Sequence, residues 1–247
     1  MSNKVGHPVP IVARTMWQSL SRYLLMMLLI FVVIYVVIAV IIAATGKVTT
    51  STVEIAGAGG PKYVLFSYGL IMLVTLMPVY AAFGVTRRHF MTATVVFGTA
   101  VSLMAAVILV VAYVVERTVY QASGVLAGMP SYPLRTWADL VPLLVQIWLV
   151  FLAHLVSAWL IALGYWRTGP TWGTLLLPLA VIPAIATEAV FGAKWIGTGV
   201  DALLRVSPAP WPWATVISVA LCAAGIAVAY AAIRTVPIGV AQRIVKF

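Results

Sequence analysis

The sequence predicts an all-α membrane protein with six transmembrane helices, and three features of its composition support this prediction. Of its 247 residues, 64% are hydrophobic and only 8% are charged, whereas a soluble domain carries about 25% charged residues. Apolar runs of about 20 residues or more recur along the chain, each long enough to cross a bilayer as a helix. The basic residues are distributed unevenly between the segments that separate these runs, which predicts an orientation.

Residues 1–22 are predicted to form a cytoplasmic amphipathic interfacial helix. From Val12 onward, apolar residues recur at helical spacing, and the intervening polar positions include Arg14 and Arg22. A helix with a basic face and an apolar face lies in the membrane surface. A simple solvated flank is the alternative. The transmembrane domain, residues 23–233, then begins with a span whose apolar core is longer than that of a signal peptide.

Three spans are expected in the first half of the chain, at Tyr23–Ala44, at about Val64–Phe83 and at Met91–Val115. The glycine-rich loop 45–63 lacks the Gly-Lys-Ser/Thr sequence of a phosphate-binding loop. The third span carries small residues at four-residue intervals, and such a stripe lets another helix approach closely. That helix could belong to this chain or to a second copy of it. The residues of this helix-packing stripe are Thr94, Gly98, Ser102 and Ala106.

Three further spans are expected in the second half, at Leu140–Trp166, from Trp172 to about Phe191 and at Trp213–Ile233. A tight turn at residues 167–170 separates the first two. The second of these spans contains Pro178 and Pro183, so we expect it to be kinked or broken. Residues 192–212 are expected to form a short external or re-entrant segment, and residues 234–247 a cytoplasmic tail.

The charge distribution predicts that both termini are cytoplasmic. With six spans and the N-terminus inside, nine of the 15 basic residues and none of the five acidic residues lie on the cytoplasmic side. Short loops rich in Lys and Arg remain cytoplasmic, so this orientation is strongly favoured. The cytoplasmic basic residues are Lys4, Arg14, Arg22, Arg87, Arg88, Arg167, Arg234, Arg243 and Lys246.

The short segment between the second and third spans contains the motif Gly-Val-Thr-Arg-Arg-His-Phe. A span lies on each side of this motif, and the second of these spans ends in Glu-Arg. This arrangement resembles the membrane subunits of type-2 ABC exporters, the ABC-2 permease family. The resemblance covers residues 76–117 best and continues through residues 163–169 and 233–237. In that family, the loop is a short cytosolic coupling helix that sits in a cleft of a separate ATPase subunit. The resemblance therefore implies an ATPase coupling loop made of Gly84, Val85, Thr86, Arg87, Arg88, His89 and Phe90.

From composition alone, Arg87 and Arg88 are equally well explained as residues that only set the topology. The resemblance favours a coupling role, because an arginine can pair with a carboxylate on a partner surface and stack on an aromatic ring. We expect Phe83 and Phe90 to seat this turn by packing.

The resemblance also implies a function: a permease subunit of an ABC transporter in the plasma (inner) membrane of a bacterium, exporting a lipid, a peptide or a drug-like amphiphile. Two such subunits, identical or homologous, would assemble with two ATPase chains. ATP and Mg would bind in those ATPases, so this chain would hold no cofactor and would not itself be an enzyme. One alternative is a six-span membrane interaction or assembly protein without transport. A secondary transporter or channel is less favoured, because neither internal repeats nor acidic residues near mid-membrane are evident.

Three charged residues are candidates for an outer gate, namely Glu116, Arg117 and Glu188. Glu116 and Arg117 end the third span, and plain interfacial termination is the alternative to the gate that the resemblance suggests. Because the two are adjacent, they cannot share one helix face, and each needs its own partner. Glu188 lies in the fifth span, where a carboxylate is costly unless it is paired or hydrated. A glutamate that snorkels to the interface or is paired, with Lys194 close in sequence, is favoured over a gate or a site for a cationic substrate.

Gln146 and His154 lie within the fourth span, two turns apart and on nearly the same helix face. Hydrogen bonding between helices is the favoured role for this intramembrane polar pair. No metal site is predicted, because the other histidines, His7 and His89, lie on the cytosolic side. No catalytic motif is recognised. The net charge of +10 is attributed to the cytoplasmic bias and to anionic membrane lipids, rather than to nucleic acid.

Overall fold

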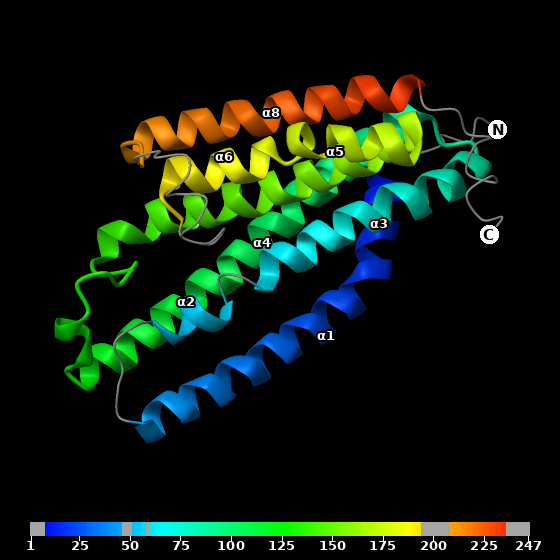
Figure 1. Cartoon of the computed structure of the whole chain (residues 1–247). Coiled ribbons are helices and arrows are strands. Elements are labelled where there is room, and N and C mark those ends of the chain that lie inside the picture. The colour runs from blue at the N-terminus through cyan, green and yellow to red at the C-terminus, as the bar shows by residue number, and fades with distance from the viewer. Residues whose placement is uncertain (1–7, 46–50, 58–59, 194–207, 236–247) are drawn as a thin grey trace.

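The computed structural model describes residues 8–45, 51–57, 60–193 and 208–235, and all regular structure in these ranges is helical. The helices form an elongated bundle in which most of the long helices run side by side (Figure 1). Short helices connect the long ones at one end of it. In chain order the elements are α1 (Pro8–Thr45), α2 (Thr52–Gly57), α3 (Gly60–Ala82), α4 (Arg87–Ala122), the 3-10 helices η1 (Val125–Gly128) and η2 (Trp137–Asp139), α5 (Leu140–Ala180), α6 (Ile182–Phe191) and α8 (Trp211–Thr235).

Four helical stretches in the described ranges are long and apolar enough to cross a membrane: Gly60–Ala82, Arg87–Ala122, Trp137–Phe191 and Trp211–Thr235. The prediction of an all-α, multi-pass membrane protein is confirmed at this level. The third stretch has 55 residues, far more than one crossing requires. It contains a reversal of the chain, visible where α5 turns back toward α6 (Figure 1).

This reversal occurs at Gly169, as the Arg-Thr-Gly-Pro sequence predicts. Gly169 has φ = 80°, a left-handed conformation that residues with a side chain rarely adopt. The hydroxyl groups of Tyr165 and Thr174 lie 3.0 Å apart across the turn. The returning helix is interrupted again between Ala180 and Ile182, just after Pro178. The predicted break in this segment is therefore confirmed.

The part of α5 before Gly169 is the centre of the bundle. Its side chains from Leu149 to Ala158 are all buried, and α3, α4, α6 and α8 all pack against α5. Close approach depends on glycine at the crossing points. A Cβ atom added at Gly98 would lie 2.7 Å from the Trp159 ring, and one at Gly69 would lie 2.9 Å from the Cβ of Ala158.

Two predicted boundaries differ from the structure. No helix ends at residue 22, because α1 is one helix of 38 residues that includes both the interfacial segment and the expected first span. Its apolar face does not only meet lipid: Val12 and Met16 are buried, and the Trp17 ring packs 6.2 Å from that of Phe97 in α4. The predicted loop 45–63 contains α2 and the first turn of α3. Most of the segment 192–212 and the tail from residue 236 lie outside the described residues.

Candidate functional site

The α3–α4 turn contains the residues predicted to couple to an ATPase, but it does not contain a separate helix. Gly84 has φ = 77° and makes the turn, and Thr86 caps α4, accepting a hydrogen bond from the backbone N–H of His89 through its hydroxyl oxygen. Arg87 to Phe90 are the first turn of α4 itself. The expected coupling helix is thus replaced by a capped turn, because the Thr-x-x-His sequence starts the long helix directly.

The two phenylalanines of this turn behave differently from each other. Phe90 is buried, and its ring lies 5.8 Å from that of Tyr80, so it seats the turn as predicted. Phe83 does not pack within the described part of the chain, and 80% of its surface is exposed. The prediction that both residues pack is therefore wrong for Phe83. Phe83, Gly84, Thr86 and Arg88 together form an exposed surface at this end of the bundle.

Arg87 and Arg88 occupy an unfavourable position for a cation. The N-terminus of a helix carries a partial positive charge, and a basic residue there costs up to about 1 kcal/mol. No acidic residue offsets this charge in the first turn of α4. The Arg87 guanidinium donates a 2.8 Å hydrogen bond to the carbonyl oxygen of Arg234, which lies in the last turn of α8. Arg88 is exposed, and its side chain interacts with the Tyr230 hydroxyl group of α8.

Glu116 is buried at the other end of α4, where its carboxylate binds the N-terminus of α2. Oε1 accepts hydrogen bonds from the backbone N–H groups of Thr52 (2.6 Å) and Val53 (3.2 Å). Oε2 accepts from the hydroxyl group of Ser51 (2.5 Å) and from that of Tyr132 (3.1 Å), whose single proton is shared with the carbonyl oxygen of Tyr113 (2.9 Å). Burial, and then the carboxylate itself, raises the pKa of the Tyr132 phenol, which keeps it a donor. Glu116 thus joins α2, α4 and the loop after η1.

Arg117, the next residue, points away from Glu116. It is 7% exposed, its Nη2 donates to the carbonyl oxygen of Arg135 (3.2 Å), and its guanidinium lies 4.3 Å from the Trp137 ring centroid. Neither Glu116 nor Arg117 ends the helix, because α4 continues to Ala122. The expectation that the adjacent residues need separate partners is confirmed.

Glu188 does not join these two residues, and its partners lie on two other helices. Its Oε1 is 2.5 Å from Nζ of Lys62 in the first turn of α3 and 3.2 Å from Nε2 of His154 in α5. All three side chains are at least 95% buried. The favoured pairing of Glu188 is therefore confirmed with Lys62 as the partner, while Lys194 lies outside the described residues. We call Lys62, His154 and Glu188 the buried triad.

The buried triad lies well inside the bundle. His154 follows the start of α5 by 14 residues, or about 21 Å of helix. Helices α3 and α4 both run away from the α3–α4 turn, α3 over 23 residues and α4 over 36. Lys62 is near the end of α3 that is remote from this turn, and it therefore lies roughly 20 Å closer to the turn than the remote end of α4 does. Charges at such a depth are retained only when they pair with one another.

Hydrogen-bond geometry assigns the tautomer of His154 in the buried triad. His154 Nδ1 lies 2.8 Å from the carbonyl oxygen of Val150, which can only accept, so Nδ1 carries a hydrogen. In a neutral imidazole, Nε2 would then present a lone pair to Glu188 Oε1. Nε2 lies 3.2 Å from Oε1, the same carboxylate oxygen that Lys62 contacts, and a proton shared between Nε2 and Oε1 would make this contact a hydrogen bond. The Tyr63 ring lies edge-on to His154 on the side of α3.

The remaining predicted residues have structural surroundings. Thr94, Gly98, Ser102 and Ala106 are all buried, and Gly98 contacts Leu155 and Trp159, so the stripe packs on α5 of the same chain at that point. Gln146 is only half-buried. Among the described residues, no group of three or more His, Cys, Asp or Glu side chains is placed to hold a metal ion.

Sequence reasoning did not single out Lys62 or Tyr132. Lys62 follows Pro61 at the edge of an apolar run, where a lysine usually marks the flank of a span. Tyr132 lies in a loop of mixed composition and acts through the carboxylate that it binds. In both cases the partner is distant in the sequence or on another element, so no local pattern could reveal it.

Comparisons with protein-family models, with curated proteins and with solved structures find no match to this chain. The described residues contain three candidate sites: the exposed α3–α4 turn, the Glu116 cluster with the adjacent Arg117, and the buried triad. The Glu116 cluster consists of Glu116, Ser51, Thr52, Val53 and Tyr132.

Proposed function

We propose that this chain is the membrane-spanning permease subunit of an ABC exporter, with six spans and both termini in the cytoplasm. The exposed α3–α4 turn carries this proposal. It presents an aromatic side chain, Phe83, and a cation, Arg88, at one end of the bundle. Arginine and aromatic side chains are enriched in the energetically dominant positions of protein interfaces.

The distribution of charge along the bundle supports the orientation. The turn lies beside the last turn of α8, which places Arg87, Arg88 and Arg234 together. The described acidic residues Glu54 and Glu116 lie at the α2 end of α4 instead. A basic end without acidic residues is the pattern expected of the cytoplasmic side. The six spans would be α1, α3, α4, the two halves of the hairpin around Gly169, and α8.

In this proposal the work of ATP hydrolysis is done by two separate ATPase chains, which bind ATP and Mg. Two permease subunits, identical or homologous, would enclose the path of a lipid, a peptide or a drug-like amphiphile. The turn would transmit closure of the ATPases to α3 and α4, because Phe90 and the Arg87–Arg234 contact join it rigidly to the bundle.

The test is a pair of substitutions at exposed positions, which should leave the fold unchanged. Phe83→Ala combined with Arg88→Ala should lower co-purification of the neighbouring ATPase, and its turnover in nanodiscs, by more than about tenfold. Arg167→Ala is the matched control, since Arg167 is also exposed and lies at the Gly169 turn. Normal ATPase binding and turnover by the Phe83/Arg88 variant would refute the coupling role.

One observation favours a second function, that of a proton-coupled secondary transporter. The buried triad contains an acidic residue and an exchangeable proton deep in the bundle, which is where proton-driven carriers place such groups. Proteoliposomes containing this chain alone, with a pH-sensitive dye inside, distinguish the two functions. Proton movement without any ATPase, and its loss in Glu188→Gln, would favour the carrier. No proton movement in this assay, together with normal ATPase coupling, would favour the exporter.

A further inference from the structure

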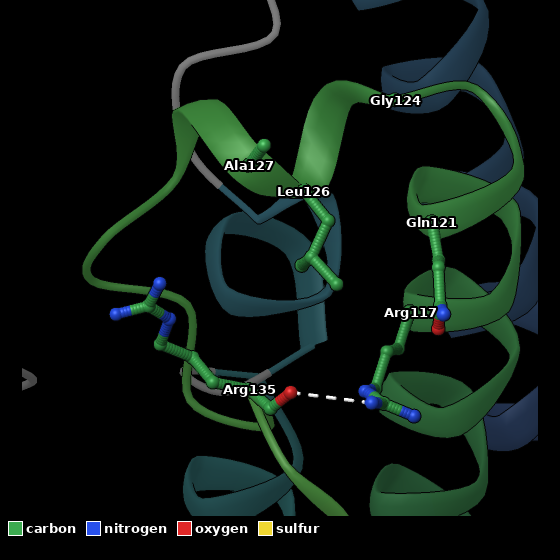
Figure 2. A pocket seen from close by; sticks show the side chains of 6 residues that line it. All are labelled: Arg117, Gln121, Gly124, Leu126, Ala127 and Arg135. Carbon is green, nitrogen blue, oxygen red and sulfur yellow. Dashed lines mark hydrogen bonds between the residues drawn. The ribbon is translucent and has the colours of Figure 1, made fainter.

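A pocket of about 360 Å³ lies at the end of α4 that is remote from the α3–α4 turn. Its lining comes from Arg117, Gln121, Gly124, Leu126, Ala127 and Arg135. Arg117 and Gln121 stand one turn apart on α4, and η1 provides the facing wall (Figure 2). Ligand pockets generally have volumes of about 300 to 1,000 Å³. This pocket therefore has room for a small ligand or for the headgroup of a larger one.

Arg117 lines this space and has unused hydrogen-bonding capacity. Although the side chain is 93% buried, being 7% exposed, its Nε and Nη1 atoms have no hydrogen-bond partner among the described residues. Only Nη2 donates, to the carbonyl oxygen of Arg135. A guanidinium stays charged at any physiological pH, and a buried charge without its hydrogen bonds is costly. An anion in the pocket would supply the missing acceptors.

The other groups around the pocket also favour an anion. The lining includes the Arg117 side chain and contains no acidic residue. The carboxylates on neighbouring segments are already engaged, Glu116 with α2 and Asp139 with Thr136. The planar arrangement of arginine N–H donors matches the oxygens of a phosphate group. Leu126 and Ala127 add an apolar wall that suits an organic substituent on that phosphate.

We infer that this pocket binds a phosphate group, carried either by a lipid headgroup or by a small soluble compound. Arg117 binds the phosphate oxygens, and Gln121 offers a second donor from the same side of α4. The backbone carbonyl of Arg135 accepts the hydrogen bond from Arg117 Nη2, and the Arg135 guanidinium is directed away from Arg117 (Figure 2). This binding requires neither an ATPase nor a proton gradient, so it is independent of the proposed function.

The test uses the full chain in nanodiscs of neutral phosphatidylcholine. In one arm, inorganic phosphate and glycerol phosphate are titrated and binding is measured by calorimetry. In the other arm, the nanodiscs also contain phosphatidylglycerol, and the lipid that the protein retains on extraction is measured by mass spectrometry. Saturable binding in the first arm identifies a soluble ligand, and selective retention in the second identifies a lipid headgroup. Binding in neither arm overturns the inference.

Three variants connect the binding to the pocket. Arg117→Gln should weaken binding by about tenfold or more. Arg135→Gln is the matched control, because it removes the same charge from the same region and should have almost no effect. Ala127→Trp fills the pocket from an exposed position and leaves Arg117 in place, so it should abolish binding even where Arg117→Gln folds poorly. Undiminished binding by Ala127→Trp overturns the inference.

Discussion

Glu116 and Glu188 are each only 2% exposed, yet their charges are stabilised in opposite ways. The four hydrogen bonds described above for Glu116 come from uncharged donors, namely two backbone N–H groups and two hydroxyl groups. Glu188 instead contacts a cation, Lys62, and a group that can become one, His154. Both carboxylates lie on long helices of the same bundle.

The difference indicates different roles for the two residues. The donors around Glu116 come from the start of α2 and from the loop after η1, so this carboxylate connects these segments to α4. A carboxylate at a helix N-terminus is stabilising. The buried triad instead places two titratable groups, His154 and Glu188, 3.2 Å apart, and its net charge changes when either of them gains or loses a proton. The Glu116 cluster is therefore expected to stabilise local structure, and the buried triad to respond to its surroundings.

The largest effect is expected from Lys62→Met, which removes the cation beside Glu188. Removing one partner of a buried ion pair costs about 3–5 kcal/mol, because the other charge remains buried. We expect the free energy of unfolding, measured by titration with a denaturing detergent, to fall by this amount. The double variant Lys62→Met/Glu188→Leu should recover most of the loss. A double variant as unstable as the sum of both single variants would show that the pair is not coupled.

Glu116→Ala should cost less, about 2 kcal/mol, because its partners are neutral donors that partly regain water. The effect should be local. Amide hydrogen exchange in residues 51–57 should accelerate, while exchange around His154 stays unchanged. Glu116→Gln retains a carbonyl acceptor and serves as the control with a smaller effect. Unchanged exchange in α2 after Glu116→Ala would contradict the role of this carboxylate as a cap.

His154→Gln should cost about 1 kcal/mol, the net value of one hydrogen bond. The ion pair between Lys62 and Glu188 remains in this variant, so the bundle should stay folded. Infrared spectra recorded across a pH series should lose the carboxyl band change that the shared proton produces. The same band change in the variant and in the original chain would mean that His154 takes no part in holding the proton.

Tyr132→Phe should have the smallest effect, at most about 1 kcal/mol, and this effect should depend on pH. The pKa of the phenol is raised above its ordinary value of 10.0 by burial and by Glu116. Its stabilisation is therefore fully present below about pH 10 and is lost as pH rises above that value. The stability difference between the variant and the original chain should be constant up to about pH 9 and should shrink as pH rises from about 10 to about 12. A difference that grows over this range would contradict the assignment.

Mean hydropathy could not reveal which helix is central. The α8 stretch has the higher mean hydropathy, 2.4 against 2.1 for the stretch containing α5. Nevertheless, only 28% of the most apolar 18 residues of the α8 stretch are buried, against 61% for the stretch containing α5. Lipid and a protein interior are both apolar, so composition does not distinguish them. Only the crossing points, such as Gly98 on Trp159, place α5 in the middle.

By itself, the sequence determined the helical class, the positions of the apolar helices, the reversal at Gly169 and the break near Pro178. These are local properties, set by hydropathy over one span and by the φ that glycine or proline allows. The tertiary structure decided the partners of the polar residues: Lys62 reaches Glu188 across 126 positions, and Glu116 reaches Ser51 across 65. Such contacts depend on which helices pack together. That choice results from the fit of many side chains at once, so no single segment of the sequence contains it.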